Sequence, residues 1–266
     1  MLRNSSRSLR SRAAACLLTT AALTLTLAGC GQDSTSPREA RGQAGVKASD
    51  AKAHLNAAEA PGSVDCAKAK CIALTFDAGP GPHTPRLLDI LREKKVPATF
   101  FLLGKNHVDT YPDTVRRAAA EGHEIANHTW THRRLDQLKP AEIRSELGRT
   151  QQAIKALTGR EPTLMRPPQG RTDGEVTDVS KELGLSQVLW SATAKDYATT
   201  DSALIQKRIP DQAGRDGIIL LHDIYDGTVP AVPGIIDELK RRGYTFVTVP
   251  RLLAPGTAQP GTVYRP

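Results

Sequence analysis

Residues 72–102 read IALTFDAGPGPHTPRLLDILREKKVPATFFL and contain a strand, a helix and a second strand in succession. Ile72 to Phe76 and Ala98 to Leu102 are short apolar runs rich in bulky side chains, which is typical of buried strands. Between them, Pro85 to Lys94 places three leucines on one helical face. Strands joined by a helix are parallel and covered on both faces, so this stretch predicts an α/β fold.

The same alternation continues to about Leu253. We predict further helices over residues 111–121, 140–158, 174–183, 203–209 and 232–241, and further strands over residues 124–127, 164–165, 187–190, 218–221 and 245–248. This many βα units fit a (β/α) barrel better than an open sheet. In such barrels the active site lies where the strands end.

A basic start and an apolar run open the chain. Ala13 to Leu27 is apolar and runs into Leu27-Ala28-Gly29-Cys30. The run is too short to span a bilayer comfortably, and small residues before a cysteine are typical of a cleavage site. We therefore predict an export signal over residues 1–29.

This cleavage region resembles the lipobox of bacterial lipoproteins. The resemblance implies that Cys30 is acylated and becomes the mature N-terminus, anchored to the outer face of the cell membrane. The alternative is an ordinary secretory signal cleaved nearby. Both interpretations place the protein outside the cytoplasm.

The charge of the chain restricts its partners. The whole chain carries +8, and four of those charges precede Cys30, where no acid occurs: Arg3, Arg7, Arg10 and Arg12. The mature protein is therefore near +4, an excess that suits an anionic wall or membrane surface. No basic block is interleaved with aromatic residues, so we expect no nucleic-acid partner.

The cysteines divide by position. Cys16 belongs to the signal, Cys30 is the candidate lipid site, and Cys66 and Cys71 remain. Because an exported protein occupies a disulfide-permissive compartment, a disulfide between Cys66 and Cys71 is favoured over a metal site.

Composition sets the boundaries of the domain. Residues 30–63 are rich in small and polar residues without an apolar period, which predicts a flexible tether. Residues 64–254 carry the alternating elements and form one domain, which we expect to be monomeric. Residues 255–266 are rich in Pro, Gly and Thr and predict a loose tail.

Two histidines form the first candidate metal site. His128 and His132 are four residues apart, a spacing that lets two imidazoles on one helical turn share a divalent ion. Alone the pair is a weak signal, because such pairs are more often surface residues. Other polar residues follow the predicted strands and would share one rim of the barrel. They are Asp77, Arg166, Asp196, His222 and Asp223.

Five segments together resemble the ordered motifs of the NodB-homology polysaccharide deacetylases, carbohydrate esterase family 4. They are TFDAGP at 75–80, HTWTH at 128–132, RPPQG at 166–170, WSATAKDY at 190–197 and LLHD at 220–223. The resemblance covers essentially residues 71–253 and implies a distorted, partly open (β/α) barrel. It also implies a hydrolase that removes acetyl groups from polysaccharides.

The resemblance assigns catalytic roles. Asp77 would be the general base, and Arg166 would orient this carboxylate and keep it ionised. His222 would be the general acid that protonates the departing group, with Asp196 orienting it. His128 and His132 would hold a divalent metal that activates water and polarises the acetyl carbonyl. Imidazole ligands suit zinc, with cobalt or nickel as alternatives.

The resemblance also suggests residues that contact the substrate. Leu220 would line a pocket for the acetyl methyl, and Trp190 would help to wall it. Gln169 stands where an aromatic residue is common, but its backbone N–H can still serve as an oxyanion donor. Tyr197 replaces a tryptophan of the fourth motif, and Thr193 replaces an aspartate.

One departure concerns the metal itself. The usual motif carries two aspartates, of which the second completes the metal's protein ligands, and here Ala78 occupies that position. Losing this carboxylate weakens the expected metal affinity. His83 lies within sequence reach as a substitute ligand, although a rim or structural role is favoured for it.

Three functions therefore remain open. N-deacetylation of N-acetylglucosamine polymers is favoured, with peptidoglycan first because a lipoprotein is held beside the wall, and chitin-like oligomers next. O-deacetylation of acetylated xylan or a similar polymer is a rival with the same chemistry. A non-catalytic glycan-binding protein is the alternative that the loss of the second aspartate raises.

Overall fold

The computed structural model describes residues 34–43 and 64–266. In these residues the strands form one sheet in the order β1-β10-β6-β5-β4-β3-β2-β8-β7, with β9 paired to β2 off this path. The paired strands are parallel, and the first and last strands of the order do not pair with each other. The predicted distorted, partly open (β/α) barrel is therefore confirmed.

Strand β2 (Cys71–Asp77) lies at the centre and all of its residues are buried. It pairs with β3 (Thr99–Leu102), β8 (Gly217–His222) and β9 (Thr245–Val247). A strand covered on both faces needs a continuous apolar run, which is what the sequence supplies up to Thr75. Shorter strands complete the sheet: β4 (Glu124–Asn127), β5 (Leu164–Met165), β6 (Ser186–Val188) and β7 (Ala192–Thr193).

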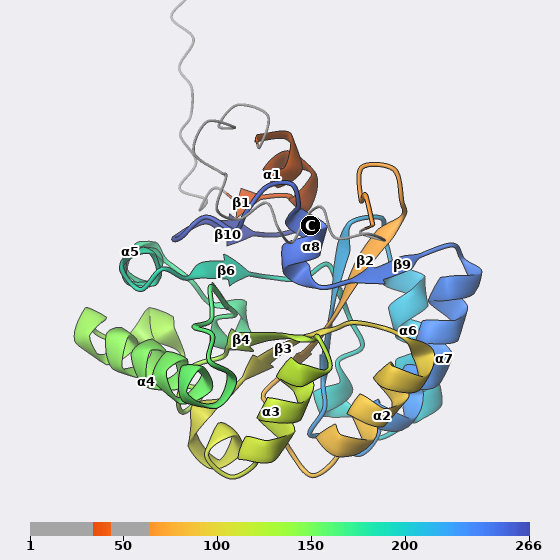
Figure 1. Cartoon of the computed structure of the whole chain (residues 1–266), viewed down its shortest axis with the longest axis horizontal. Helices are drawn as coiled ribbons and strands as arrows, with labels where there is room; N and C mark the ends of the chain where they lie inside the picture. Colours follow the sequence, from red (N-terminus) through yellow and green to blue (C-terminus); the bar gives the residue numbers. More distant parts are fainter. Residues whose placement is uncertain (1–33, 44–63) are drawn as a thin grey trace, which may run out of the picture. The chain divides into compact units, whose positions relative to one another are not determined.

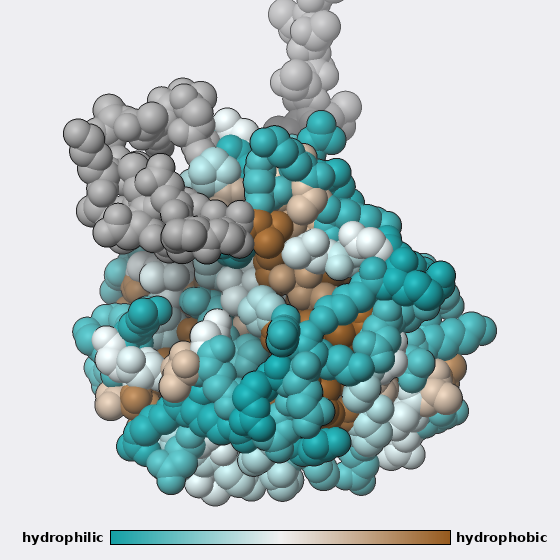
Figure 2. Space-filling view, turned by 45° about the vertical axis from the view of Figure 1, so that its right-hand side comes forward, coloured by the Kyte–Doolittle hydropathy of each residue, from teal (hydrophilic) through white to brown (hydrophobic). Residues whose placement is uncertain are grey.

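Helices pack around the sheet (Figure 1), with α4 and α5 at one side of the view and α2, α6 and α7 at the other. They are α2 (Thr84–Lys94), α3 (Pro112–Ala120), α4 (Pro140–Thr158), α5 (Gly174–Glu182), α6 (Ser202–Gln212), α7 (Thr228–Arg241) and α8 (Val249–Leu253). Their apolar faces and the strands bury one large cluster that includes Leu87, Phe100 and Ile235. Figure 2 shows that polar residues cover most of one face of the molecule, with apolar residues in a central band and in scattered smaller patches.

The predicted tether over residues 30–63 is wrong in part. Residues 34–43 form β1 (Ser34–Thr35) and α1 (Pro37–Gln43), and Ala40 is buried against the same apolar cluster as Leu252. The signal was present locally: Ser36 and Glu39 satisfy each other's backbone N–H groups in a capping box that starts the helix. The low apolar content of this segment concealed it.

The predicted loose tail is also wrong. Strand β10 (Val263–Tyr264) inserts between β1 and β6, and Tyr264 is 2% exposed. Its hydroxyl accepts a hydrogen bond from the backbone N–H of Gln259, so this tail is part of the domain. Two-residue strands carry too little sequence to show a period, which is why composition misled the prediction.

Cys66 and Cys71 form a disulfide at the entry to β2, with a Cα–Cα distance of 5.4 Å. The predicted signal peptide and Cys30 lie outside the described residues. Among the residues that are described, no helix is long and apolar enough to cross a membrane.

Candidate active site

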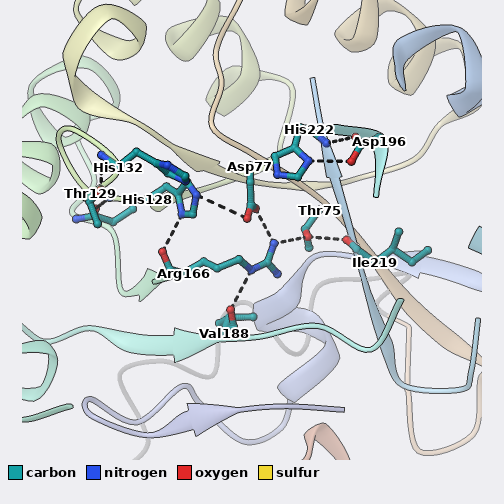
Figure 3. Close-up of polar contacts among 11 residues, drawn as sticks. Thr75, Asp77, His128, Thr129, His132, Arg166, Val188, Asp196, Ile219 and His222 are labelled. Atoms are coloured by element: carbon teal, nitrogen blue, oxygen red, sulfur yellow. Dashed lines mark hydrogen bonds and ion pairs between the residues drawn. The ribbon is translucent and has the colours of Figure 1, made fainter. Parts of the chain in front are cut away.

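Asp77 and His222 are register partners at the last positions of β2 and β8. Thr75 and Leu220 are paired two residues earlier, so these side chains share a face with Asp77 and His222. Figure 3 shows Asp77 with His128 and His132 on one side and His222 with Asp196 on the other. The sheet thus gathers the predicted catalytic residues at the end where its strands terminate.

Arg166 is a fully buried cation directly after β5. Its Nη1 donates to Asp77 Oδ1 over 2.6 Å and to Thr75 Oγ1 over 2.8 Å, and its Nε donates to the carbonyl of Val188. The guanidinium also lies 4.1 Å from the ring centroid of Phe101. These contacts fix one Asp77 oxygen and leave the other, Oδ2, facing the histidines.

Asp77 is 3% exposed, and burial raises the pKa of its carboxyl above the ordinary value. Arg166 opposes that rise because a neighbouring positive charge favours the carboxylate. A carboxylate that is moderately basic yet held in place suits a general base working near neutral pH.

His222 and Asp196 form a second charged pair. The Asp196 carboxylate accepts from His222 Nδ1 at 2.9 Å and from Thr228 Oγ1 at 2.7 Å. Burial lowers the pKa of His222, but the hydrogen bond and charge of Asp196 outweigh it, and the net pKa is raised. The raised pKa favours the protonated imidazole, the form that a general acid needs, and Asp196 binds Nδ1 rather than Nε2.

His128 and His132 do meet, although not on the helical turn that their spacing suggested. They lie in the loop after β4, where Thr129 and His132 both have positive φ, and their ring centroids are 4.9 Å apart. His128 Nδ1 donates to the carbonyl of Arg166 over 2.8 Å, which leaves Nε2 as the lone-pair nitrogen.

Sequence reasoning missed the residues that shape this loop. Asn127 accepts from the backbone N–H of Thr129 and donates to the carbonyl of Leu147 in α4. Glu146, 8% exposed, accepts from two backbone N–H groups of the loop, those of Trp130 and Thr131. No local signal in the sequence marked this contact, because an acid on an amphipathic helix is ordinarily exposed.

The donor set fits a metal only in part. Two imidazoles with free Nε2 atoms suit a divalent ion, and Asp77 Oδ2 lies 3.8 Å from His128 Nε2. Across residues 34–43 and 64–266, no third histidine, cysteine or carboxylate completes a cluster able to hold a metal. His83 pairs instead with Asp226 at 3.0 Å, in agreement with its favoured rim role.

Ala78 keeps a conformation that suits the residue it replaces. Its φ is +64°, in the left-handed region that alanine rarely adopts and that aspartate and asparagine tolerate better. The backbone is held there by a hydrogen bond from Ala78 N–H to the carbonyl of Phe101. Ala78 is 6% exposed, so a side chain at this position is buried.

The predicted substrate-contacting residues flank the site on two sides. Tyr197, 58% exposed, lies 6.1 Å from the His222 ring and lines an open pocket of about 540 Å³ with Tyr225. Gln169 and Trp190 line a second pocket of about 240 Å³ together with Arg265, a tail residue that sequence reasoning did not consider. Leu220 lies beneath His222 at 5% exposure.

Asp223, beside His222, points away from the chemistry. Its side chain is fully buried, accepts a short hydrogen bond from Thr84, and leaves no room for a Cβ at Gly79. Burial raises the pKa of Asp223 to about 6. We assign it to supporting the loop that follows Asp77.

Comparison with known proteins agrees with this geometry. Residues 65–188 match the profile of the polysaccharide deacetylase family. Peptidoglycan-N-acetylglucosamine deacetylase PgdA of Listeria monocytogenes is 36% identical over 214 residues, which cover 78% of this chain and 45% of that protein. A chitooligosaccharide deacetylase of Bradyrhizobium is 36% identical over 204 residues, covering 71% of this chain and 93% of that protein.

Among solved structures, a T48 deacetylase with substrate is 40% identical, has a TM-score of 0.73, and covers 76% of this chain and 100% of its own. The chain therefore belongs to the polysaccharide deacetylase family. It spans about half the length of the Listeria relative.

The family also contains chains without activity. A mutant of a protein described as a pseudoenzyme of carbohydrate esterase family 4 is 28% identical, with a TM-score of 0.66, and covers 70% of this chain and 68% of its own. Another mutant of that protein is described as having restored enzymatic activity. Membership alone thus leaves turnover to be decided by the site.

Proposed function

We propose that this protein is a metal-assisted deacetylase that hydrolyses N-acetyl groups of a glycan outside the cytoplasm. The observation that carries the proposal is the opposed pair at the strand ends: the Asp77 carboxylate on β2 and the Asp196-bound imidazole of His222 on β8. One group is equipped to accept a proton and the other to donate one, on either side of the same small space.

The steps follow from these two groups. Asp77 takes a proton from a water molecule as the water oxygen attacks the acetyl carbonyl carbon. The backbone N–H of Gln169 stabilises the oxyanion that forms. His222 then gives its proton to the sugar nitrogen as the C–N bond breaks, which releases acetate and a free amine. A divalent ion, zinc in the first place, held by His128 and His132 would lower the pKa of the water and polarise the carbonyl.

Arg166 and Asp196 prepare these groups without touching the reacting atoms. Arg166 holds Asp77 Oδ1 and so directs Oδ2 toward the water. Asp196 holds Nδ1 of His222 and so directs Nε2 toward the leaving nitrogen. Leu220, Trp190 and Tyr197 would bound the acetyl and sugar groups.

The substrate that we favour is peptidoglycan, with chitin-like oligomers second. The names of the Listeria and Bradyrhizobium relatives support these two glycans, and acylation of Cys30 would hold the enzyme beside the wall as a monomer. O-deacetylation of acetylated xylan remains the rival, since the same two groups serve an ester.

The second candidate is a glycan-binding protein without turnover. The observation that favours it is Ala78 in place of the carboxylate ligand. Against it, Asp77, His222, Arg166 and Asp196 keep the contacts that catalysis needs, although a binding protein requires none of them.

Acetate release decides between these functions. The chain from Gln32 onward is incubated with N-acetylglucosamine oligomers, peptidoglycan and acetylated xylan after chelation, and again after zinc or cobalt is restored. We expect release that returns with metal and is lost in Asp77→Asn and His222→Ala. Glycan binding without release from any substrate, by folded and metal-supplied protein, would establish the binding protein instead.

A further inference from the structure

We infer that the end of the domain at which the strands begin rests on an anionic membrane surface, so that the active site faces away from the membrane. The inference rests on the lipid anchor at Cys30 in the proposed function. It adds the orientation of the anchored domain relative to the membrane. Three features of the described residues carry it: where β1 starts, where residues 34–43 attach to the domain, and where basic side chains lie.

The first feature is the length of the connection. Strand β1 starts at Ser34, so only residues 31–33 separate it from Cys30. Fully extended, this connection reaches about 14 Å, whereas a tether ending at residue 63 would reach about 110 Å. An acylated Cys30 would therefore hold the start of β1 within about 14 Å of the membrane interface.

The second feature is the firm attachment of residues 34–43 to the domain. Arg41, largely buried, donates to Asp216 over 2.6 Å and to the carbonyl of Leu252 over 2.7 Å. A Cβ at Gly256 would lie 2.3 Å from the carbonyl oxygen of Ala40, so the helix and the tail are in close contact. The orientation of the anchored end is thus transmitted to the whole domain.

The third feature is the place of α1 in the barrel. Its Arg41 pairs with Asp216, the residue directly before β8, so α1 lies at the end where β2 and β8 begin. Residues just before β2 and β8, such as Ala67 and Arg215, share a groove with Arg38 of α1 at this end. Asp77 and His222 lie at the opposite end, about 20 Å away along β2.

The charges at this end suit an anionic lipid surface. Arg38, Lys68 and Arg215 are exposed, and we call them the basic rim. The acids beside them are the exposed Glu39, which follows Arg38, the exposed Asp65, which pairs with Lys68, and the buried Asp216, which pairs with Arg41 and lies 3.9 Å from Arg215. Arg38 and Arg215 line the same groove, about 690 Å³ in volume.

Each basic residue near an anionic bilayer adds roughly fivefold to binding. Together with the short connection, the basic rim would orient the domain with Asp77 and His222 toward the glycan. The substrate would then be membrane-proximal glycan, reached without the domain turning over.

Vesicle sedimentation tests the basic rim without the anchor or the chemistry. The unacylated chain Gln32–Pro266 is mixed with vesicles of phosphatidylglycerol and phosphatidylcholine, or of phosphatidylcholine alone. We expect binding only to the anionic vesicles. The triple variant Arg38→Glu, Lys68→Glu and Arg215→Glu should lower the partition coefficient by about tenfold or more.

A matched charge control separates the basic rim from net charge. It reverses three exposed residues elsewhere: Arg86→Glu, Lys105→Glu and Lys207→Glu. Retained binding by this variant supports the inference, and an equal loss would overturn it, as would no binding by the unaltered chain. Mass spectrometry of Cys30 from the full chain is read separately: without an acyl group, the anchor and this orientation both fail, while acetate release still reports on the chemistry.

Discussion

Asp196 accepts two hydrogen bonds from His222, one from the ring at Nδ1 over 2.9 Å and one from the backbone N–H over 2.7 Å. The carboxylate therefore fixes both the position of the strand end and the tautomer of the imidazole. Thr228 at the start of α7 holds the same carboxylate from behind. The Asp196 carboxylate thus joins the end of β8 to the start of α7 and favours the protonated form of His222.

The pH dependence of turnover should report this pair. Because the pKa of His222 is raised, the protonated acid is present below that pKa and is lost as pH rises through it. Asp196→Asn removes the raising charge and leaves burial, which lowers the pKa. We expect the alkaline limb of kcat to move to lower pH and kcat to fall by about tenfold or more.

Asp226→Asn is the control for this measurement, because Asp226 is exposed and pairs with His83 rather than His222. Its alkaline limb should coincide with that of the unaltered enzyme. An unshifted limb in Asp196→Asn would refute the role of His222 as the acid.

Restoring a carboxylate at position 78 should strengthen metal binding. Ala78→Asp would add a carboxylate as a third protein ligand to the two histidines, His128 and His132. The backbone at position 78 has a positive φ that aspartate tolerates. We expect the dissociation constant for zinc to fall by about tenfold or more, measured by competition with a chromophoric chelator. Ala78→Asn, which fits the same backbone but lacks the charge, should gain far less. Equal affinities in all three proteins would show that this position does not face the metal.

The N-terminal segment should contribute to the stability of the domain. Arg41→Ala removes the closer of the two ion pairs of the largely buried Asp216 carboxylate and leaves only Arg215, 3.9 Å away, at a cost of about 1–3 kcal/mol. We expect Tm to fall by about 3–8 °C in calorimetry. Arg38→Ala, on the exposed side of the same helix, should leave Tm unchanged. A chain starting at Ser63, which lacks both β1 and α1, should unfold at a lower temperature than either variant.

Glu124 should make the domain less stable at alkaline pH. Burial raises the pKa of this carboxyl from 4.5 to about 7, and Arg160 only partly opposes it. The folded state therefore binds the Glu124 proton more tightly than the unfolded state does. The resulting contribution to the free energy of unfolding is complete below pH 4.5 and is lost as pH rises through about 7.

Glu124→Gln should remove that loss and raise the free energy of unfolding at alkaline pH by about 2 kcal/mol, measured by urea denaturation. At acidic pH the two proteins should be equally stable. Glu175→Gln, at an exposed position on α5, serves as the control and should change neither value. An equal gain in the free energy of unfolding at acidic and alkaline pH would contradict a raised pKa for Glu124.

The sequence by itself determined the βα order and the residues at the strand ends. Apolar runs such as Ile72 to Phe76 can be satisfied only by burial on both faces, and the polar residue that follows each run must then emerge at the rim. Asp77, Arg166 and His222 could therefore be assigned to one end before their contacts were known.

Only the tertiary structure decided how His128 and His132 meet, and where the domain begins and ends. The loop that joins the histidines is held by Asn127 and Glu146, contacts that no local period encodes. Strands β1 and β10 are two residues long and stable only because they pair with each other and with β6. Ser34 pairs with Val263, and Val263 pairs with Gln187, all of them distant in sequence, so this pairing depends on how the whole domain packs and leaves no signal in the local sequence.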